Sequence, residues 1–155
     1  MNHLLNQATS ELASFLTLHL PRLSSNWWQD FVDSKLSFNQ RQFVQWQGAN
    51  SLYQLDFAAL LRVIDLGWWE ISKCCFFPRE TRCWVKELQS VRNRWARPSA
   101  QPIVPSDFYR DADTLGRFIA VLNPDSELLR AIESVKARSI LAMANDVTRS
   151  STDAS

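Results

Sequence analysis

Four apolar residues spaced four, three and four positions apart run through residues 79–97: Trp84, Leu88, Val91 and Trp95. This spacing places their side chains on one stripe of an α-helix. Arg92 falls at the edge of the stripe, and Asn93 and Arg97 fall away from it. Because a proline disfavours helical backbone at the residue before it, Pro98 predicts that the helix ends at Arg97. The stretch is therefore expected to pack through its tryptophans and to carry a polar, arginine-rich side.

Helical periodicity recurs along most of the chain. Apolar residues three or four positions apart predict further helices over residues 4–19, 27–32, 37–46, 55–72, 106–122 and 124–141. The segment 55–72 has a broad apolar face, which is typical of a central helix that touches several neighbours. No stretch alternates convincingly between apolar and polar residues, so the predicted fold class is all-α.

Several residues predict where helices begin or end. Gly48 is expected to follow the helix over 37–46 as its terminating glycine, and Ser106 is expected to cap the helix that follows it. Asn123 and Pro124 are expected to be the cap and first residue of the last helix. Gly67 predicts either a close helix crossing or a break before the next residue, because glycine is unfavourable inside a helix.

Length and composition predict a single domain. The chain has 155 residues, 46% of them hydrophobic, with only three glycines and six prolines, which excludes a disordered or fibrous chain. We expect one helical domain over residues 1–145, divided into an N-terminal helix (1–24) and a core bundle (25–145). From Asp146 the apolar periodicity stops, so residues 146–155 are expected to be a flexible tail or linker.

Charge and hydropathy limit the classes of partner. With 17 basic and 16 acidic residues the net charge is +1, so any nucleic-acid binding must come from a local cluster. No uninterrupted apolar window reaches about 18 residues, which predicts no membrane span. The N-terminus lacks the basic start of a signal peptide, and a cytoplasmic location is expected.

Three cysteines, Cys74, Cys75 and Cys83, form no Cys-x-x-Cys pattern and have no histidine near them in the sequence. A zinc site needs about four ligands, so no metal is predicted and the thiols are expected to be reduced and partly buried. No motif implies another cofactor. With only His3 and His19, general acid–base chemistry near neutral pH has few candidate residues.

Four isolated acids are candidates for site residues: Asp56, Asp65, Asp111 and Asp113. On amphipathic helices such acids are usually caps, ion-pair partners or part of a solvated face, and that is the expectation here.

The order and sequence of four segments resemble the HEPN superfamily (higher eukaryotes and prokaryotes nucleotide-binding). These segments are Leu55-Asp56-Phe57-Ala58-Ala59-Leu60-Leu61, Gly67-Trp68-Trp69-Glu70-Ile71-Ser72, residues 85–96 and Asp113-Thr114-Leu115. The resemblance is to the branch fused to bacterial helicases and ATPases, which includes defence proteins and a eukaryotic nuclear endoribonuclease of RNA quality control. It implies a bundle of four to five main helices, with short N-terminal helices here, that usually dimerises. In active members an Arg-x(4–6)-His motif, often with Asn after the Arg, carries metal-independent ribonuclease chemistry.

Carried over to this chain, the resemblance assigns Arg92 and Asn93 as the catalytic motif positions, and position 97, where histidine is expected, is Arg. A histidine with a pKa of about 6.5 can exchange protons with RNA oxygens, whereas an arginine stays protonated. Loss of acid–base help costs about 10²–10⁴-fold in rate. Arg92, Arg94 and Arg97 are therefore better suited to bind the RNA backbone than to cut it.

Three functions stay open at this point. The first is a non-catalytic module with a degenerate ribonuclease motif, which forms homodimers, binds RNA or phosphate, and serves a fused or associated ATPase or helicase. The second is an active endoribonuclease that leaves 2′,3′-cyclic phosphate ends, in which either Arg92 and Asn93 suffice or a histidine is supplied by His3 or His19. The third is a structural scaffold for protein interactions whose arginines are paired with acids.

Overall fold

The computed structural model describes residues 2–48, 50–97 and 103–153, and within these ranges every regular element is helical. The all-α prediction is confirmed. The α-helices are α1 (Asn2–His19), α2 (Phe38–Gln47), α3 (Phe57–Leu66), α4 (Trp68–Cys75), α5 (Glu80–Ala96), α6 (Pro105–Leu122) and α7 (Leu128–Asp153). Short 3₁₀ or π turns join them: η1 (Leu20–Arg22), η2 (Trp28–Val32), η3 (Asp33–Lys35) and η4 (Leu52–Gln54).

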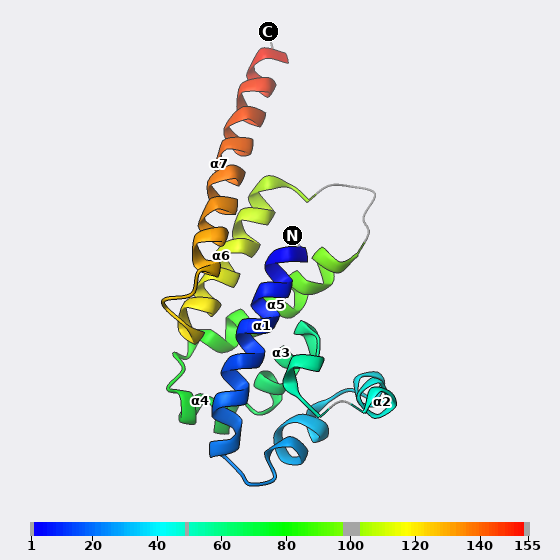
Figure 1. The fold of residues 1–155 in the computed structure, drawn as a ribbon. Helices are drawn as coiled ribbons and strands as arrows, with labels where there is room; N and C mark the ends of the chain where they lie inside the picture. The colour runs from blue at the N-terminus through cyan, green and yellow to red at the C-terminus, as the bar shows by residue number, and fades with distance from the viewer. Residues whose placement is uncertain (1, 49, 98–102, 154–155) are drawn as a thin grey trace.

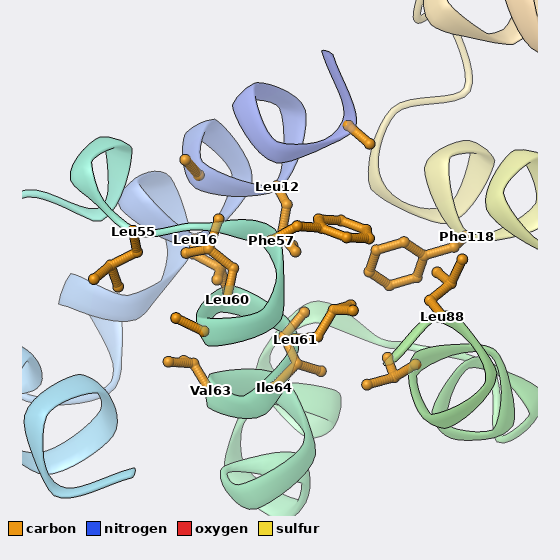
Figure 2. Packing of buried hydrophobic residues seen from close by; sticks show 14 of the residues in the cluster. Leu12, Leu16, Leu55, Phe57, Leu60, Leu61, Val63, Ile64, Leu88 and Phe118 are labelled. Carbon is orange, nitrogen blue, oxygen red and sulfur yellow. The ribbon is translucent and has the colours of Figure 1, made fainter. Parts of the chain in front are cut away.

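Helix α3 lies at the centre of the bundle, as its broad apolar face predicts. Six of its ten residues are buried. Figure 2 shows Leu60 and Leu61 of α3 among Leu12 of α1, Leu88 of α5 and Phe118 of α6, and all five side chains are 0% exposed. Burial of an aliphatic or aromatic side chain of this size contributes about 1.5–3 kcal/mol, so these contacts are a large part of what holds the helices together.

The predicted helix over 55–72 is two helices, because the chain breaks at Gly67. A Cβ atom at Gly67 would lie 3.0 Å from the backbone oxygen of Val63 and 3.0 Å from Cδ1 of Ile71. A side chain at this position would require its neighbours to shift. Because α3 ends at Leu66 and α4 begins at Trp68, the break is the alternative found at Gly67.

Helix α1 confirms the first predicted helix and is part of the core. Leu12, Ala13 and Leu16 are all 0% exposed, and α1 packs against α3, α6 and α7. No helix in the described part of the chain is long and apolar enough to cross a membrane.

Helix α2 projects from the side of the bundle in Figure 1. Ser37 and Gln40 form a reciprocal capping box at its start, and Gly48 ends it with a φ of 63°, as predicted. Before α2, the expected helix over 27–32 is a single π turn followed by a 3₁₀ turn.

Helix α7 runs back along α6 and extends beyond it (Figure 1). Two predicted boundaries here are wrong. Pro105 is the first residue of α6, so Ser106 is not its cap, and α7 begins at Leu128 rather than at Pro124. The helix also continues through Asp153, so residues 146–153 of the expected flexible tail or linker are helical, with exposed side chains.

Candidate nucleic-acid interface

The buried side of α5 sets which of its residues face solvent. Val85, Leu88 and Val91 are 0% exposed and Trp95 is 7% exposed, whereas Trp84 is only partly buried. The predicted stripe is therefore correct for three of its four members, and Val85 rather than Trp84 lies at the centre of the packing. With the helix fixed in this orientation, Asn93 and Arg97 face solvent and Arg92 lies at the margin of the core.

Arg92 forms an ion pair across to the start of α3. Its Nη2 lies 3.3 Å from Oδ2 of Asp56, and its Nη1 donates to Oδ1 of Asn93 at 3.4 Å. The other oxygen of Asp56 accepts a hydrogen bond from the backbone N–H of Ala59 at 2.8 Å and so caps α3. The side chains of Arg92 and Asp56 are 33% and 58% exposed. Such solvent-accessible pairs contribute only about 0–1 kcal/mol, so an anion can compete for the guanidinium.

Arg94 has a different environment, because its partner is a buried carboxylate. Its Nη2 donates to Oδ1 of Asp111 at 2.6 Å, and Nε1 of Trp95 donates to Oδ2 of the same carboxylate at 3.2 Å. Asp111 is 0% exposed. The Trp95 ring packs edge-on against Phe108, with centroids 5.3 Å apart. Arg94 thus anchors α5 to α6, and a cation in this position is poorly available to a ligand.

Arg97 follows the last residue of α5 with extended backbone, as predicted for a residue before proline. It is exposed, and it has no ion-pair partner among the described residues. The two histidines lie elsewhere. His3 contacts Gln7 on α1, His19 packs on Phe15, and neither is hydrogen bonded to Arg92 in the described structure.

The four candidate acids all have structural partners. Asp56 and Asp111 are described above, Asp65 pairs with Arg82 and Lys86, and Asp113 pairs with Arg117 and Lys136. The hydrogen bond from Lys136, helped by that from Arg117, lowers the pKa of Asp113 below its ordinary value despite partial burial. The expectation of caps and ion pairs is confirmed for these four residues.

A pocket of about 420 Å³ opens beside Asp56, and sequence reasoning missed it. The pocket lies between α2 and the start of α3, and its lining residues are Asn39, Gln40, Phe43, Gln54, Leu55, Asp56 and Ala59. It therefore shares Asp56 with Arg92 and combines side-chain amides with an aromatic ring. The amide-rich, aromatic run over 38–47 was the available signal, but only the placement of α2 against α3 reveals the pocket.

A second cluster joins residues that are far apart in the sequence. His19, Cys74 and Cys75 lie together, with one donor atom of each within 4.8 Å of the others. No histidine lies near these cysteines in the sequence, but the fold brings the end of α1, with His19, to the end of α4. Burial and the nearby Arg22 charge lower the pKa of His19, and burial together with Cys74 raises the pKa of Cys75 to about 12.

Comparison with known protein families gives one match. Residues 3–123 match the model of a family described as Swt1-like HEPN. Searches of curated proteins and of solved structures gave no match. The matched region includes α2 to α6 and all of α1 except Asn2, and hence Asp56, Asp111 and the whole Arg92–Arg97 stretch. Since the match extends over well more than half of the chain, the protein belongs to the Swt1-like HEPN family.

Proposed function

We propose that this HEPN domain is a non-catalytic module that binds single-stranded RNA through its phosphate backbone, with Arg92 as the principal contact and Arg97 beside it. The observation that carries the proposal is the state of Arg92: its guanidinium is held in place by Asp56 and Asn93, yet it is one-third exposed and its pairing is weak. A phosphate oxygen can replace the Asp56 carboxylate without any change in the bundle.

The absence of cutting follows from the residue at position 97. Where the motif histidine is expected, the chain has Arg97, which has no lone pair to accept a proton and stays charged at any working pH. An arginine can neutralise a phosphate but cannot take a proton from a 2′-hydroxyl. The partners of His3 and His19 support this assignment, because neither histidine is hydrogen bonded to Arg92 in the described structure.

The pocket beside Asp56 suits a nucleobase next to the bound phosphate. Phe43 supplies a ring on which a base can stack, which is worth about 1–3 kcal/mol in proteins that bind single strands. Asn39, Gln40 and Gln54 supply amide groups along its wall. We further propose that the domain forms homodimers and serves a fused or associated ATPase or helicase, as the resemblance implies.

The test is binding of labelled single-stranded RNA at low and moderate salt. Arg92→Ala should weaken binding several-fold and reduce the dependence of log K on log salt by about 0.7 for each phosphate that the protein no longer neutralises. Asp56→Asn should strengthen binding, since asparagine caps a helix as well as aspartate does but no longer competes for the guanidinium. Arg110→Ala is the matched control, because Arg110 is exposed and pairs weakly with Glu87.

Other outcomes would identify the competing functions. Products with 2′,3′-cyclic phosphate ends that disappear in Arg92→Ala would show an active endoribonuclease. No shift of the RNA at any salt concentration would favour a protein-interaction scaffold. A protein that stays strictly monomeric in light scattering at high concentration would contradict the proposed dimer.

A further inference from the structure

The cluster of His19, Cys74 and Cys75 is separate from the proposed RNA surface, since none of its residues is bonded to Arg92 or Asp56 or lines the pocket beside them. His19 is the last residue of α1, and the two cysteines are the last residues of α4. All three are partly buried, so a small ion can reach them from solvent.

The chain positions the cysteines through an unusual residue after α4. Phe76 has a φ of 55°, the only positive value at a non-glycine residue in the described structure, and this left-handed conformation ends α4 at Cys75. The next residue, Phe77, donates its backbone N–H to the oxygen of Ser72 at 3.0 Å. The turn therefore ends α4 directly after the two cysteines.

Aromatic rings fix the histidine side of the cluster. Phe15 packs against the His19 ring with centroids 4.3 Å apart, and Phe77 stacks on Phe15 at 5.5 Å and on Trp68 at 6.0 Å. The Nδ1 atom of His19 is buried and has no hydrogen-bond partner among the described residues. A buried imidazole nitrogen without a partner is costly unless something binds it.

A disulfide does not account for the two thiols. Cα atoms of adjacent residues are about 3.8 Å apart, which is shorter than the range of about 4.4–6.8 Å that disulfides prefer. Cys74 and Cys75 are both free thiols. Two thiols and an imidazole are donors that favour thiophilic metal ions, whereas no carboxylate belongs to the cluster.

We propose that His19, Cys74 and Cys75 form a Zn²⁺ site that fastens the end of α1 to the end of α4. Tetrahedral coordination with Zn–S and Zn–N bonds of about 2.3 and 2.0 Å places the donor atoms about 3.5–3.8 Å apart. The present separations of up to 4.8 Å need to shorten by about 1 Å, which small side-chain rotations can supply. Each thiol that becomes a thiolate ligand releases its proton to the buffer, and no oxidation or reduction takes place.

Three protein ligands leave the fourth position for water or for a donor from another molecule. Two thiolates neutralise the charge of the ion. His19 is far in the sequence from Cys74 and Cys75, so the three donors come together only in the folded protein. Zn²⁺ should therefore stabilise the folded state.

The experiment is titration of the full, reduced, metal-free chain with Co²⁺ as a coloured substitute for Zn²⁺. One equivalent should bind with the charge-transfer absorption of cobalt–thiolate bonds, and Zn²⁺ should displace it. Cys75→Ser and His19→Gln should each weaken binding at least about 100-fold, since even outer-shell partners of metal ligands are worth about 10–100-fold. Zn²⁺ should raise the melting temperature of the unaltered chain but not of these variants.

Cys83→Ser is the matched control, because it also removes one thiol, but from an exposed position on α5. Its cobalt spectrum and affinity should equal those of the unaltered chain. Circular dichroism of each variant checks folding, and Cys74→Ser provides a further independent loss of a ligand. The proposal is overturned if no thiolate band appears at one equivalent, or if a folded Cys75→Ser or His19→Gln variant binds as tightly as Cys83→Ser.

Discussion

Replacement of Arg94 by alanine is the most direct test of how the end of α5 is held. The substitution leaves the carboxylate of Asp111, which is 0% exposed, with the neutral Nε1–H of Trp95 as its remaining side-chain donor among the described residues. Breaking a buried ion pair typically costs about 3–5 kcal/mol. Because the Arg94 side chain is 43% exposed, water can reach part of the site. We therefore expect the free energy of unfolding to fall by about 2–3 kcal/mol.

Urea denaturation followed by circular dichroism measures this loss, which should appear as a decrease of about 1 M or more in the midpoint. Arg110→Ala is the control, since Arg110 also joins α5 to α6 but pairs with Glu87 at 4.0 Å and is 64% exposed. That variant should lose no more than about 1 kcal/mol.

A double-mutant cycle with Asp111→Asn isolates the cause. Asparagine removes the buried charge, so the Arg94→Ala/Asp111→Asn protein should be more stable than Arg94→Ala alone, by about 1 kcal/mol or more. The reasoning would be refuted if Arg94→Ala behaved like Arg110→Ala, or if the two substitutions at 94 and 111 were simply additive.

Two further predictions follow from local geometry. Because Lys136 lowers the pKa of Asp113, the ion pair contributes stability above the ordinary carboxyl pKa of 3.8 and loses it as pH falls through the lower folded-state value. Asp113→Asn should thus have a lower urea midpoint than the unaltered chain at pH 7. When the midpoints are measured at decreasing pH, the difference between the two proteins should shrink below pH 3.8. Gly67→Ala should destabilise the fold by about 1–2 kcal/mol, because the added Cβ would meet the backbone oxygen of Val63 at 3.0 Å. Gly116→Ala, with a 3.3 Å contact only to a side chain, should change stability by less than about 1 kcal/mol in the same assay, and equal effects of the two glycine variants would contradict the steric explanation.

Features that depend on a few neighbouring residues were predictable. Helical spacing located α1, α2, α5 and α6, Gly48 marked the end of α2, and Pro98 marked the end of α5 at Arg97. Each of these depends on backbone preferences that act over one helical turn. The central position of α3 was also readable, because its apolar residues surround most of the helix.

Boundaries that depend on competing local interactions were not predictable. Asn123 does not cap α7, because its Oδ1 accepts from the backbone N–H of Asp125 and stabilises a turn before the helix. Ser126 accepts from the N–H of Leu128 instead, and its hydroxyl also bonds to Glu11 on α1. This contact spans 115 positions in the sequence, so no local pattern contains it.

Contacts with residues far away in the sequence also decide what each arginine of the motif can do. In the sequence, Arg92, Arg94 and Arg97 are equivalent cations on one short stretch, but their partners lie 36 positions away for Arg92 and 17 for Arg94. The burial of those partners separates the roles: Arg94 is committed to a buried carboxylate, whereas Arg92 shares an exposed one. Arg94→Ala should therefore bind RNA less tightly only to the extent that the protein is destabilised. Arg92→Ala should also bind RNA less tightly, but it should unfold at nearly the same urea concentration as the unaltered chain.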